Sequence, residues 1–255
     1  CRKFHGWEGV LLAPAGQGLL PRETVDGVPV TRFRYAPAAW ETLAYTGTMA
    51  DQVGAHLRGK VALAGMLALG TRAVSRAIAQ DSPDVVHAHW WFPAGMLALG
   101  GASRLPLVTT MHGSDVRLAR TNRWAAIPFR RVTRASAAVT AVSSFLADEA
   151  RVMAPGLSVA VAPMPVDTAR FAPGDTRHSA RLLFVGRLNA QKGVALLLDA
   201  LAASSSGASL DVVGGGELLT TLQAQATALN LGARVAWHGP LPQERVALMV
   251  QAATA

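Results

Sequence analysis

Short apolar stretches that alternate with helical patterns constrain the fold of this chain more than any other feature. Strands are predicted at residues 10–13, 28–35, 84–88, 106–111, 137–142, 158–162, 181–185, 209–213 and 234–237. Helices are predicted at about residues 51–80, 192–203, 217–230 and 242–252. Recurring strand–helix units predict a parallel sheet with helices on both faces, which is an α/β fold.

A proline-rich segment divides this pattern in two. Residues 163–175 read PMPVDTARFAPGD, which is typical of a connection between domains. We therefore predict a first domain at 1–165, a linker at 166–178 and a second domain at 179–255. A chain of 255 residues is long enough for two modest domains.

The segment RLLFVGRLNAQKG, residues 181–193, combines a strand, a turn and the start of a helix. Gly186 lets the backbone approach a ligand closely, Arg187 offers a planar fork of donors, and Lys192 adds a mobile positive charge. Unpaired N–H groups and the positive end of a helix dipole favour an anion at such a place. The segment predicts a phosphate or diphosphate site, although a surface turn with two solvated cations remains an alternative.

The same segment resembles the start of the C-terminal domain of family 4 glycosyltransferases, which are retaining enzymes of the GT-B fold. Other pieces follow the family's order: DVVHAHW, TTMHGSD, AVSS, PVDTARFAPG and VVGGGE. The resemblance implies two Rossmann-like domains facing across a cleft, with Arg187 and Lys192 on the diphosphate of a nucleotide-sugar donor. It also implies sugar transfer with retention to a glycan, glycolipid or small-molecule acceptor, in cell-envelope polysaccharide or glycolipid synthesis.

The HGSD turn after the strand at 106–111 holds the second group of candidate residues. The resemblance implies that His112 meets the donor sugar close to the reacting carbon, so the predicted catalytic set is His112, Arg187 and Lys192. A neutral imidazole can donate to a sugar hydroxyl without adding a fixed charge, but a histidine bonded within its own turn is the alternative. Asp115 could orient His112, bind a sugar hydroxyl or cap the following helix.

The glycine-rich turn after the strand at 209–213 consists of Gly214, Gly215, Gly216 and Glu217. It does not fit the dinucleotide pattern G-x-G-x-x-G, because Leu219 occupies the last position. The resemblance implies that this turn approaches the nucleotide of the donor. A tight turn with Glu217 favoured by the helix dipole is the structural alternative.

His87 and His89 form an H-x-H pair whose side chains share one face of a strand. We expect His87 in the core and His89 lining the ligand cleft beyond the strand's carboxyl end. With His112, Asp115 and His238, the pair suggests a metal-dependent hydrolase as a rival interpretation. An eight-stranded barrel, however, needs about 250 residues without a proline-rich break. We expect no metal and no cofactor, since none is required if the two cations face the leaving group as the resemblance implies, and the sequence has no D-x-D ion site.

The formal charge of +8 indicates attraction to anions. Basic residues are scattered, with only short clusters such as Arg130, Arg131 and Arg134, and no aromatic-rich basic stripe indicates nucleic acid. The expected location is cytoplasmic, with peripheral association at the inner membrane face left open. The apolar run at 61–70 is far shorter than the roughly 18–20 residues that span a bilayer. Cys1 alone cannot form an internal disulfide.

Both ends of the sequence depart from the family pattern. The resemblance leads us to expect an earlier strand with a glycine-rich turn before residue 9, and an E-x7-E carboxylate motif beyond the turn at 214–217. Neither is found in the sequence, so we expect the first domain to lack its first strand and the second to be incomplete. Weak donor binding and poor turnover follow, and an inactive fragment that binds nucleotide at most is the second alternative.

Overall fold

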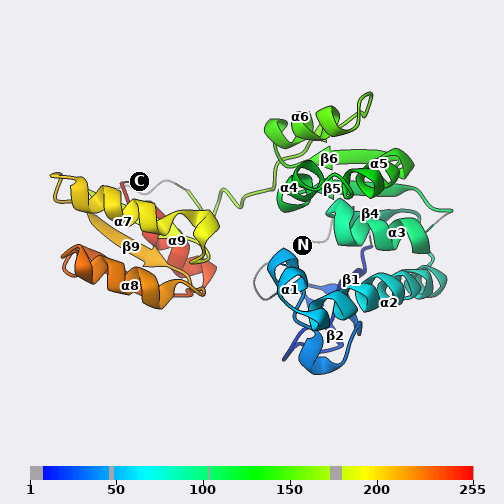
Figure 1. Ribbon diagram of the computed structural model, residues 1–255, viewed down its shortest axis with the longest axis horizontal. Helices are drawn as coiled ribbons and strands as arrows, with labels where there is room; N and C mark the ends of the chain where they lie inside the picture. The colour runs from blue at the N-terminus through cyan, green and yellow to red at the C-terminus, as the bar shows by residue number, and fades with distance from the viewer. Residues whose placement is uncertain (1–7, 46–48, 103, 173–179, 255) are drawn as a thin grey trace. The chain divides into compact units, whose positions relative to one another are not determined.

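The computed structural model describes residues 8–45, 49–102, 104–172 and 180–254. Cys1 and residues 173–178 of the predicted linker lie outside this described part. The chain forms two compact units, Cys1–Met164 and Pro165–Ala255, drawn from blue to green and from yellow to red in Figure 1. Each unit is described by itself.

The first unit begins with a small mixed sheet of order β1-β3-β2. The strands are β1 (Leu11–Pro14), β2 (Arg22–Val25) and β3 (Val28–Phe33). The predictions for β1 and β3 are confirmed, and these two strands pair in parallel. The sequence analysis missed β2, which pairs antiparallel with β3. Asp26 and Gly27 form the turn between them with φ of 50° and 80°, and an Asp-Gly pair is a recognised hairpin signal.

A second, fully parallel sheet of order β4-β5-β6-β7 carries the rest of the unit. Its strands are β4 (Val86–His89), β5 (Leu107–Met111), β6 (Ala138–Ala141) and β7 (Ala160–Val161). Each overlaps a predicted strand, so the parallel α/β pattern is confirmed here. The carboxyl ends of β4 and β5 lie side by side, because His89 is in register with Thr110.

The predicted helix at 51–80 is wrong in one respect, since the structure has two helices. Helix α1 covers Met49–Ala55 and α2 covers Leu57–Asp81, after an η1 turn at Ala38–Trp40. His56 is extended between them, with φ of −142° and ψ of 146°. A Cβ atom on Gly59 would lie only 2.1 Å from the Gln52 carbonyl oxygen, so the bare glycine lets the two helices approach closely at this break.

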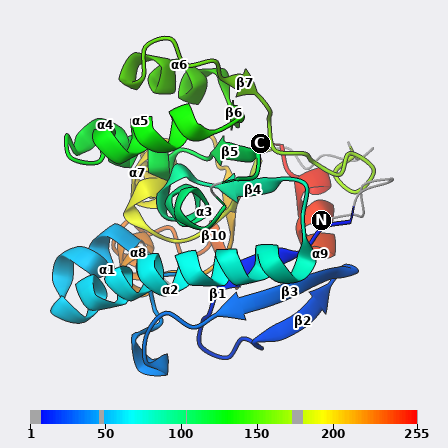
Figure 2. The same ribbon diagram turned by 90° about the vertical axis from the view of Figure 1, so that its right-hand side faces the viewer.

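The apolar run at 61–70 is too short to cross a membrane, but it lies within helix α2, whose length and composition as a whole would allow it to do so. A buried layer helix of a soluble protein can have the same character. Ala62, Met66 and Gly70 on α2 are buried, and the helix packs against β1, β3 and α3 (Figure 2). These contacts place α2 over β1 and β3 and beside α3, while only 17% of its apolar stretch is buried.

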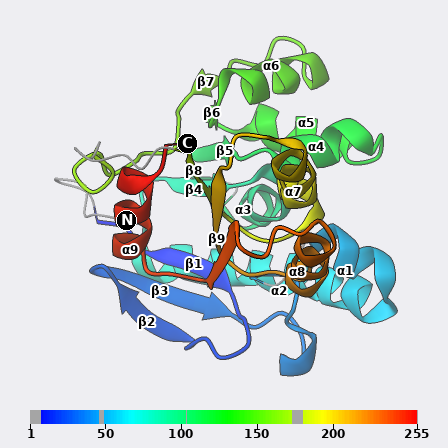
Figure 3. The same cartoon turned by 90° about the vertical axis from the view of Figure 1, so that its left-hand side faces the viewer.

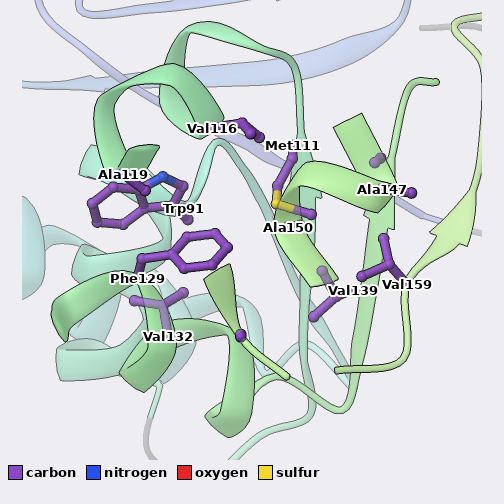
Figure 4. Packing of buried hydrophobic residues seen from close by; sticks show 12 residues of the cluster. Trp91, Met111, Val116, Ala119, Phe129, Val132, Val139, Ala147, Ala150 and Val159 are labelled. Atoms are coloured by element: carbon purple, nitrogen blue, oxygen red, sulfur yellow. The ribbon is translucent and has the colours of Figure 1, made fainter. Parts of the chain in front are cut away.

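Four further helices surround the parallel sheet. They are α3 (Met96–Gly101), which follows the η2 turn at Trp91–Gly95, and α4 (Ser114–Thr121), α5 (Ala126–Ala135) and α6 (Ser144–Met153). The main hydrophobic core of this unit contains the buried side chains of Trp91, Met111, Phe129 and Val132 (Figure 4). The Ser143 hydroxyl accepts a hydrogen bond from the Leu146 N–H at 3.3 Å, which confirms the predicted cap of α6.

The second unit is a three-stranded parallel sheet of order β10-β9-β8. Its elements are β8 (Arg181–Val185), η3 (Ala190–Lys192), α7 (Val194–Ala203), β9 (Ser209–Val213), α8 (Leu219–Ala228), β10 (Val235–Gly239) and α9 (Gln243–Ala252). Helices α7 and α8 cover one face of the sheet and α9 the other (Figure 3). Leu198, Leu210 and Leu222 are fully buried between the sheet and the first two helices. Both units are therefore α/β layers of the Rossmann-like kind.

Candidate functional site

Three histidines gather at the carboxyl ends of β4 and β5. The His89 Nδ1 atom lies 2.8 Å from His112 Nε2, so one ring donates an N–H and the other accepts it. The His87 and His89 rings stack with centroids 4.5 Å apart, which confirms that both project from the same face of β4. His87 in turn forms a 2.7 Å hydrogen bond through Nε2 with the Thr110 hydroxyl.

These histidines are held in the neutral form. Neighbouring atoms exclude water from part of each ring, and the nearby His87 and His112 rings add to this effect, so the pKa of His89 falls to about 4. Burial also lowers the pKa of His87. For His112 burial lowers the pKa, while the Asp115 carboxylate partly opposes it. At neutral pH the cluster therefore offers hydrogen-bonding groups without positive charge.

The expectation that His87 is a core residue is wrong. Both His87 and His89 are exposed, and only Ala88 between them is buried. Alternation along the strand explains this, because the buried face of β4 belongs to Ala88 and the histidines share the opposite, open face.

Trp90 is a site residue that the sequence analysis missed. Its ring centroid lies 4.8 Å from that of His112, and the side chain is 43% exposed. The backbone turns sharply here, with φ of 68°, while the Trp90 N–H still donates to the Thr110 carbonyl at 2.8 Å. The only signal in the sequence is its position directly after the H-x-H pair.

Asp115 fixes the backbone of the site, which agrees with the expected alternative that it orients His112; its binding of a sugar hydroxyl stays a prediction. The carboxylate is 3% exposed, and its Oδ1 accepts from the N–H groups of His112 and Gly113 at 3.1 and 3.0 Å. Its Oδ2 accepts from the Trp91 N–H at 3.2 Å. Asp115 thus ties the end of β5 to the segment that follows β4, and orients His112 through the main chain.

In the second unit, the glycine-rich turn packs backbone against backbone on the loop after β8. A Cβ atom on Gly214 would lie only 1.9 Å from the Gly186 carbonyl oxygen, and one on Gly216 only 2.4 Å from that of Leu188. The Leu188 N–H donates to the Gly215 carbonyl at 2.9 Å. The structure thus brings Gly186 together with Gly214, Gly215 and Gly216, and the glycines are needed for this contact.

Arg187 and Lys192 both project from this loop and are exposed. Lys192 ends the short η3 turn, and Gly193, with φ of 66°, separates it from α7. The predicted helix start at Lys192 is therefore wrong by two residues, because the left-handed glycine interrupts the helix. Glu217 is exposed in the turn before α8, which begins at Leu219 and not at Glu217.

The rival metal-dependent hydrolase finds no support. Within the described part of the chain, no group of three His, Cys, Asp or Glu residues is placed to hold a metal ion. The strands of the described segments form three separate sheets of three or four strands each and no barrel. His238 belongs to the second unit, where its Nε2 lies 2.6 Å from Asp211 Oδ1. Burial raises the Asp211 pKa, but the hydrogen bonds from Arg181, at 2.5 Å, and from His238 outweigh it, so the Asp211 pKa lies below its usual value.

Two Rossmann-like units, each with polar or basic residues beyond the carboxyl ends of its parallel strands, define a fold of the GT-B glycosyltransferase class. Two family models cover almost the whole chain. Glycosyltransferase Family 4 matches residues 5–170, and Glycosyl transferases group 1 matches residues 166–255. The chain belongs to glycosyltransferase family 4.

Curated relatives agree with this assignment. TuaC of Bacillus subtilis (strain 168), named as a teichuronic acid biosynthesis glycosyltransferase, is 30% identical over 155 residues, which are 55% of this chain and 40% of TuaC. A D-inositol 3-phosphate glycosyltransferase of Acidothermus cellulolyticus is 32% identical over 225 residues, covering 72% of this chain and 49% of the relative. The chain thus spans less than half the length of these relatives.

Solved structures show the same fold at low sequence identity. Sucrose-phosphate synthase from Thermosynechococcus elongatus superposes with a TM-score of 0.75 at 17% identity, covering 98% of this chain and 64% of that one. Anabaena Alr3699/HepE in complex with UDP gives a TM-score of 0.61 at 17% identity, covering 96% of this chain and 72% of that one.

Proposed function

We propose that the protein transfers a sugar from a nucleotide diphosphate sugar to an acceptor hydroxyl with retention of configuration. The observation that carries this proposal is the loop at 186–192, where a close glycine contact supports two exposed cations, Arg187 and Lys192. Structural relatives offer support, since Anabaena Alr3699/HepE has been solved with UDP-glucose. The name of TuaC favours an acceptor in cell-envelope polysaccharide synthesis. The proposed location is the cytoplasm.

In this mechanism the bond between the sugar carbon and the diphosphate oxygen breaks, and its electron pair stays on the diphosphate. Arg187 and Lys192 bind the oxygens on which negative charge accumulates, which stabilises the transition state more than the ground state. The acceptor oxygen forms the new bond to the sugar carbon, and its proton leaves to the departing diphosphate or to water. Gly186 and the turn Gly214–Glu217 lie beside the nucleotide.

The neutral histidine cluster suits the other side of this reaction. The sugar carbon becomes oxocarbenium-like as the leaving group departs, and an imidazolium beside it would repel that positive charge. His112, kept neutral and bonded to His89 at 2.8 Å, can donate to a sugar hydroxyl without this penalty.

The test is a donor screen on the full chain. UDP- and GDP-linked hexoses are incubated with glycan and glycolipid acceptors, and nucleoside diphosphate release and labelled product are measured. Arg187→Ala and Lys192→Ala are expected to lower kcat/KM by about 100-fold each, the loss typical of one preorganised charge at the transition state. The matched control is Arg245→Ala, an exposed arginine on α9, which is expected to leave turnover unchanged. Transfer that survives both loop substitutions would refute the proposal.

A further inference from the structure

The outer face of α5 carries an unusual combination of exposed side chains. Ile127, Arg130, Arg131 and Arg134 are all exposed and follow the spacing i, i+3, i+4, i+7, so they form one stripe along the helix. The opposite face of α5 is buried in the core through Phe129, Val132 and Thr133. Figure 4 shows the first two of these side chains. The stripe is therefore held in place by a firmly packed helix.

An aromatic residue extends this stripe beyond the start of α5. Trp124 is 69% exposed and Ile127 is 64% exposed. The Arg123 guanidinium carbon lies 5.0 Å from the centroid of the Trp124 ring, within the range of a cation–π contact. We name Arg123, Trp124, Ile127, Arg130, Arg131 and Arg134 the α5 surface. Its two large apolar side chains stand in water beside four arginines.

The charge around this surface is strongly positive. The segment 114–136 contains six arginines, at 117, 120, 123, 130, 131 and 134, and one acidic residue, Asp115. Asp115 is buried and bound to backbone N–H groups, so it does not offset the exposed charge. Among the described residues, only Arg120 of the six forms an ion pair, with Glu149 at 2.7 Å. The segment therefore complements an anionic partner.

We propose that the α5 surface docks the protein onto an anionic lipid bilayer. Trp124 and Ile127 enter the boundary between headgroups and acyl chains, where tryptophan is favoured because one part of its ring is apolar and its N–H is polar. The arginines bind lipid phosphates and keep their charged heads at the water interface. Such an arrangement lies on a membrane without spanning it.

The apolar pair favours lipid over a soluble polyanion. Arginines alone would serve to hold a phosphate chain, and exposing Trp124 and Ile127 would then bring no benefit. Sequence-tolerant nucleic-acid binders stack successive bases on several aromatic rings along a basic groove, whereas this surface has one aromatic ring, in the turn before α5. Arg130 donates to the Met153 carbonyl at 2.7 Å, but no acidic side chain among the described residues neutralises the arginines of the α5 surface. Two insertable apolar side chains beside such arginines are the pattern of a peripheral membrane contact.

Helix α2 in the same unit provides a rival surface and a matched control. It exposes Leu57 (76%) and Val61 (49%), together with Arg72 and Arg76, but its exposed positions include no aromatic residue. The pair Leu57→Ser/Arg76→Gln removes one exposed apolar side chain and one arginine. The pair Ile127→Ser/Arg131→Gln removes the same chemistry from the α5 surface.

The experiment measures co-sedimentation of the full chain with vesicles of phosphatidylcholine, with and without phosphatidylglycerol. Binding is expected only with phosphatidylglycerol and is expected to fall as salt rises. Since each basic residue near an anionic surface changes the partition coefficient by roughly fivefold, Ile127→Ser/Arg131→Gln is expected to lower it by about tenfold or more. Leu57→Ser/Arg76→Gln is expected to bind like the unchanged protein. Circular dichroism establishes that both variants are folded.

Tryptophan fluorescence gives a second readout. Phosphatidylglycerol vesicles are expected to shift the emission to shorter wavelength, and Trp124→Phe is expected to abolish most of the shift while retaining sedimentation. The proposal is overturned if no vesicle binds, if the α2 variant loses binding as much as the α5 variant, or if emission shifts equally without Trp124. It is also overturned if inorganic polyphosphate displaces the vesicles and itself binds independently of Ile127, because the surface would then be a polyanion site.

Discussion

Removing the Asp115 carboxylate should destabilise the first unit more than removing any exposed acid. In Asp115→Ala, the N–H groups of Trp91, His112 and Gly113 lose acceptors that now lie 3.0 to 3.2 Å away. A buried donor left unsatisfied costs about 1–3 kcal/mol. The Trp91 donor is buried and those of His112 and Gly113 are partly buried, so water rescues part of the loss. The expected total is about 3–6 kcal/mol, which is a large part of the stability of a typical domain.

Asp115→Asn should fall between the two extremes. Its amide oxygen can replace Oδ1 and keep the bonds from His112 and Gly113, but its NH2 group then faces the Trp91 N–H. Since the new NH2 group cannot accept from the Trp91 N–H, that hydrogen bond is lost and the Trp91 donor is unsatisfied. We therefore expect the free energy of unfolding to fall by about 1–3 kcal/mol. The expected order of stability is the unchanged protein, then Asp115→Asn, then Asp115→Ala.

The assay is denaturant unfolding followed by near-ultraviolet circular dichroism, with hydrogen exchange of the Trp91, His112 and Gly113 amides as a local readout. Asp148→Ala is the control, because Asp148 is exposed and its one ion pair among the described residues is with Arg151 along α6 at 2.6 Å. An exposed pair of this kind contributes about 0.5 kcal/mol or less. Equal unfolding midpoints for Asp115→Ala and Asp148→Ala would refute the assigned role of Asp115.

Three further outcomes can be checked independently. Nuclear magnetic resonance titration should place the pKa of His89 at about 4, against an ordinary 6.5. Because the unfolded chain binds more protons between these values, the histidine's contribution to stability is complete above pH 6.5 and is lost as the pH falls toward 4. A midpoint near 6.5 would contradict the partial desolvation assigned to the His89 ring. Gly214→Ala should destabilise the second unit by several kcal/mol in thermal unfolding, because φ is 132° and the new Cβ would lie only 1.9 Å from the Gly186 carbonyl oxygen. Gly193→Ala should cost only about 1–2 kcal/mol, because φ is 66° but no atom lies within 4 Å of the new Cβ. Equal losses of stability would show that the contact between Gly214 and Gly186 is unimportant. Ser143→Ala should cost about 1 kcal/mol in the same assay, and no change would mean that the cap of α6 does not matter.

Local patterns in the sequence were sufficient for the parts of the fold that depend on local physics. Period-two alternation placed His87 and His89 on one face, and the stacked rings agree. The short apolar runs located the strands of both parallel sheets, because a strand covered on both sides must be apolar throughout. Ser143 fulfilled its predicted cap because an N-cap depends only on residues within one turn.

Long-range contacts explain what the sequence pattern could not show. Asp115 became a backbone anchor through its contact with Trp91, a residue from a different strand end that no spacing rule identifies. The break at His56 depends on how closely Gly59 approaches Gln52, which is a packing property. Strand β2, by contrast, was missed although its Asp-Gly turn was a readable local signal. The paired roles of His112 and Arg187 on one donor remain a prediction.

The central claim, that the loop at 186–192 holds a diphosphate, is tested most directly by calorimetric titration of the full chain with UDP and GDP in parallel with UMP and GMP. We predict that each nucleoside diphosphate binds more tightly than its monophosphate. Arg187→Ala and Lys192→Ala should each weaken diphosphate binding by about tenfold, as expected for a lost charge-assisted hydrogen bond. Arg245→Ala should have no effect on diphosphate binding. Diphosphate binding that is unchanged by both loop substitutions, or weakened equally by Arg245→Ala, would contradict the account.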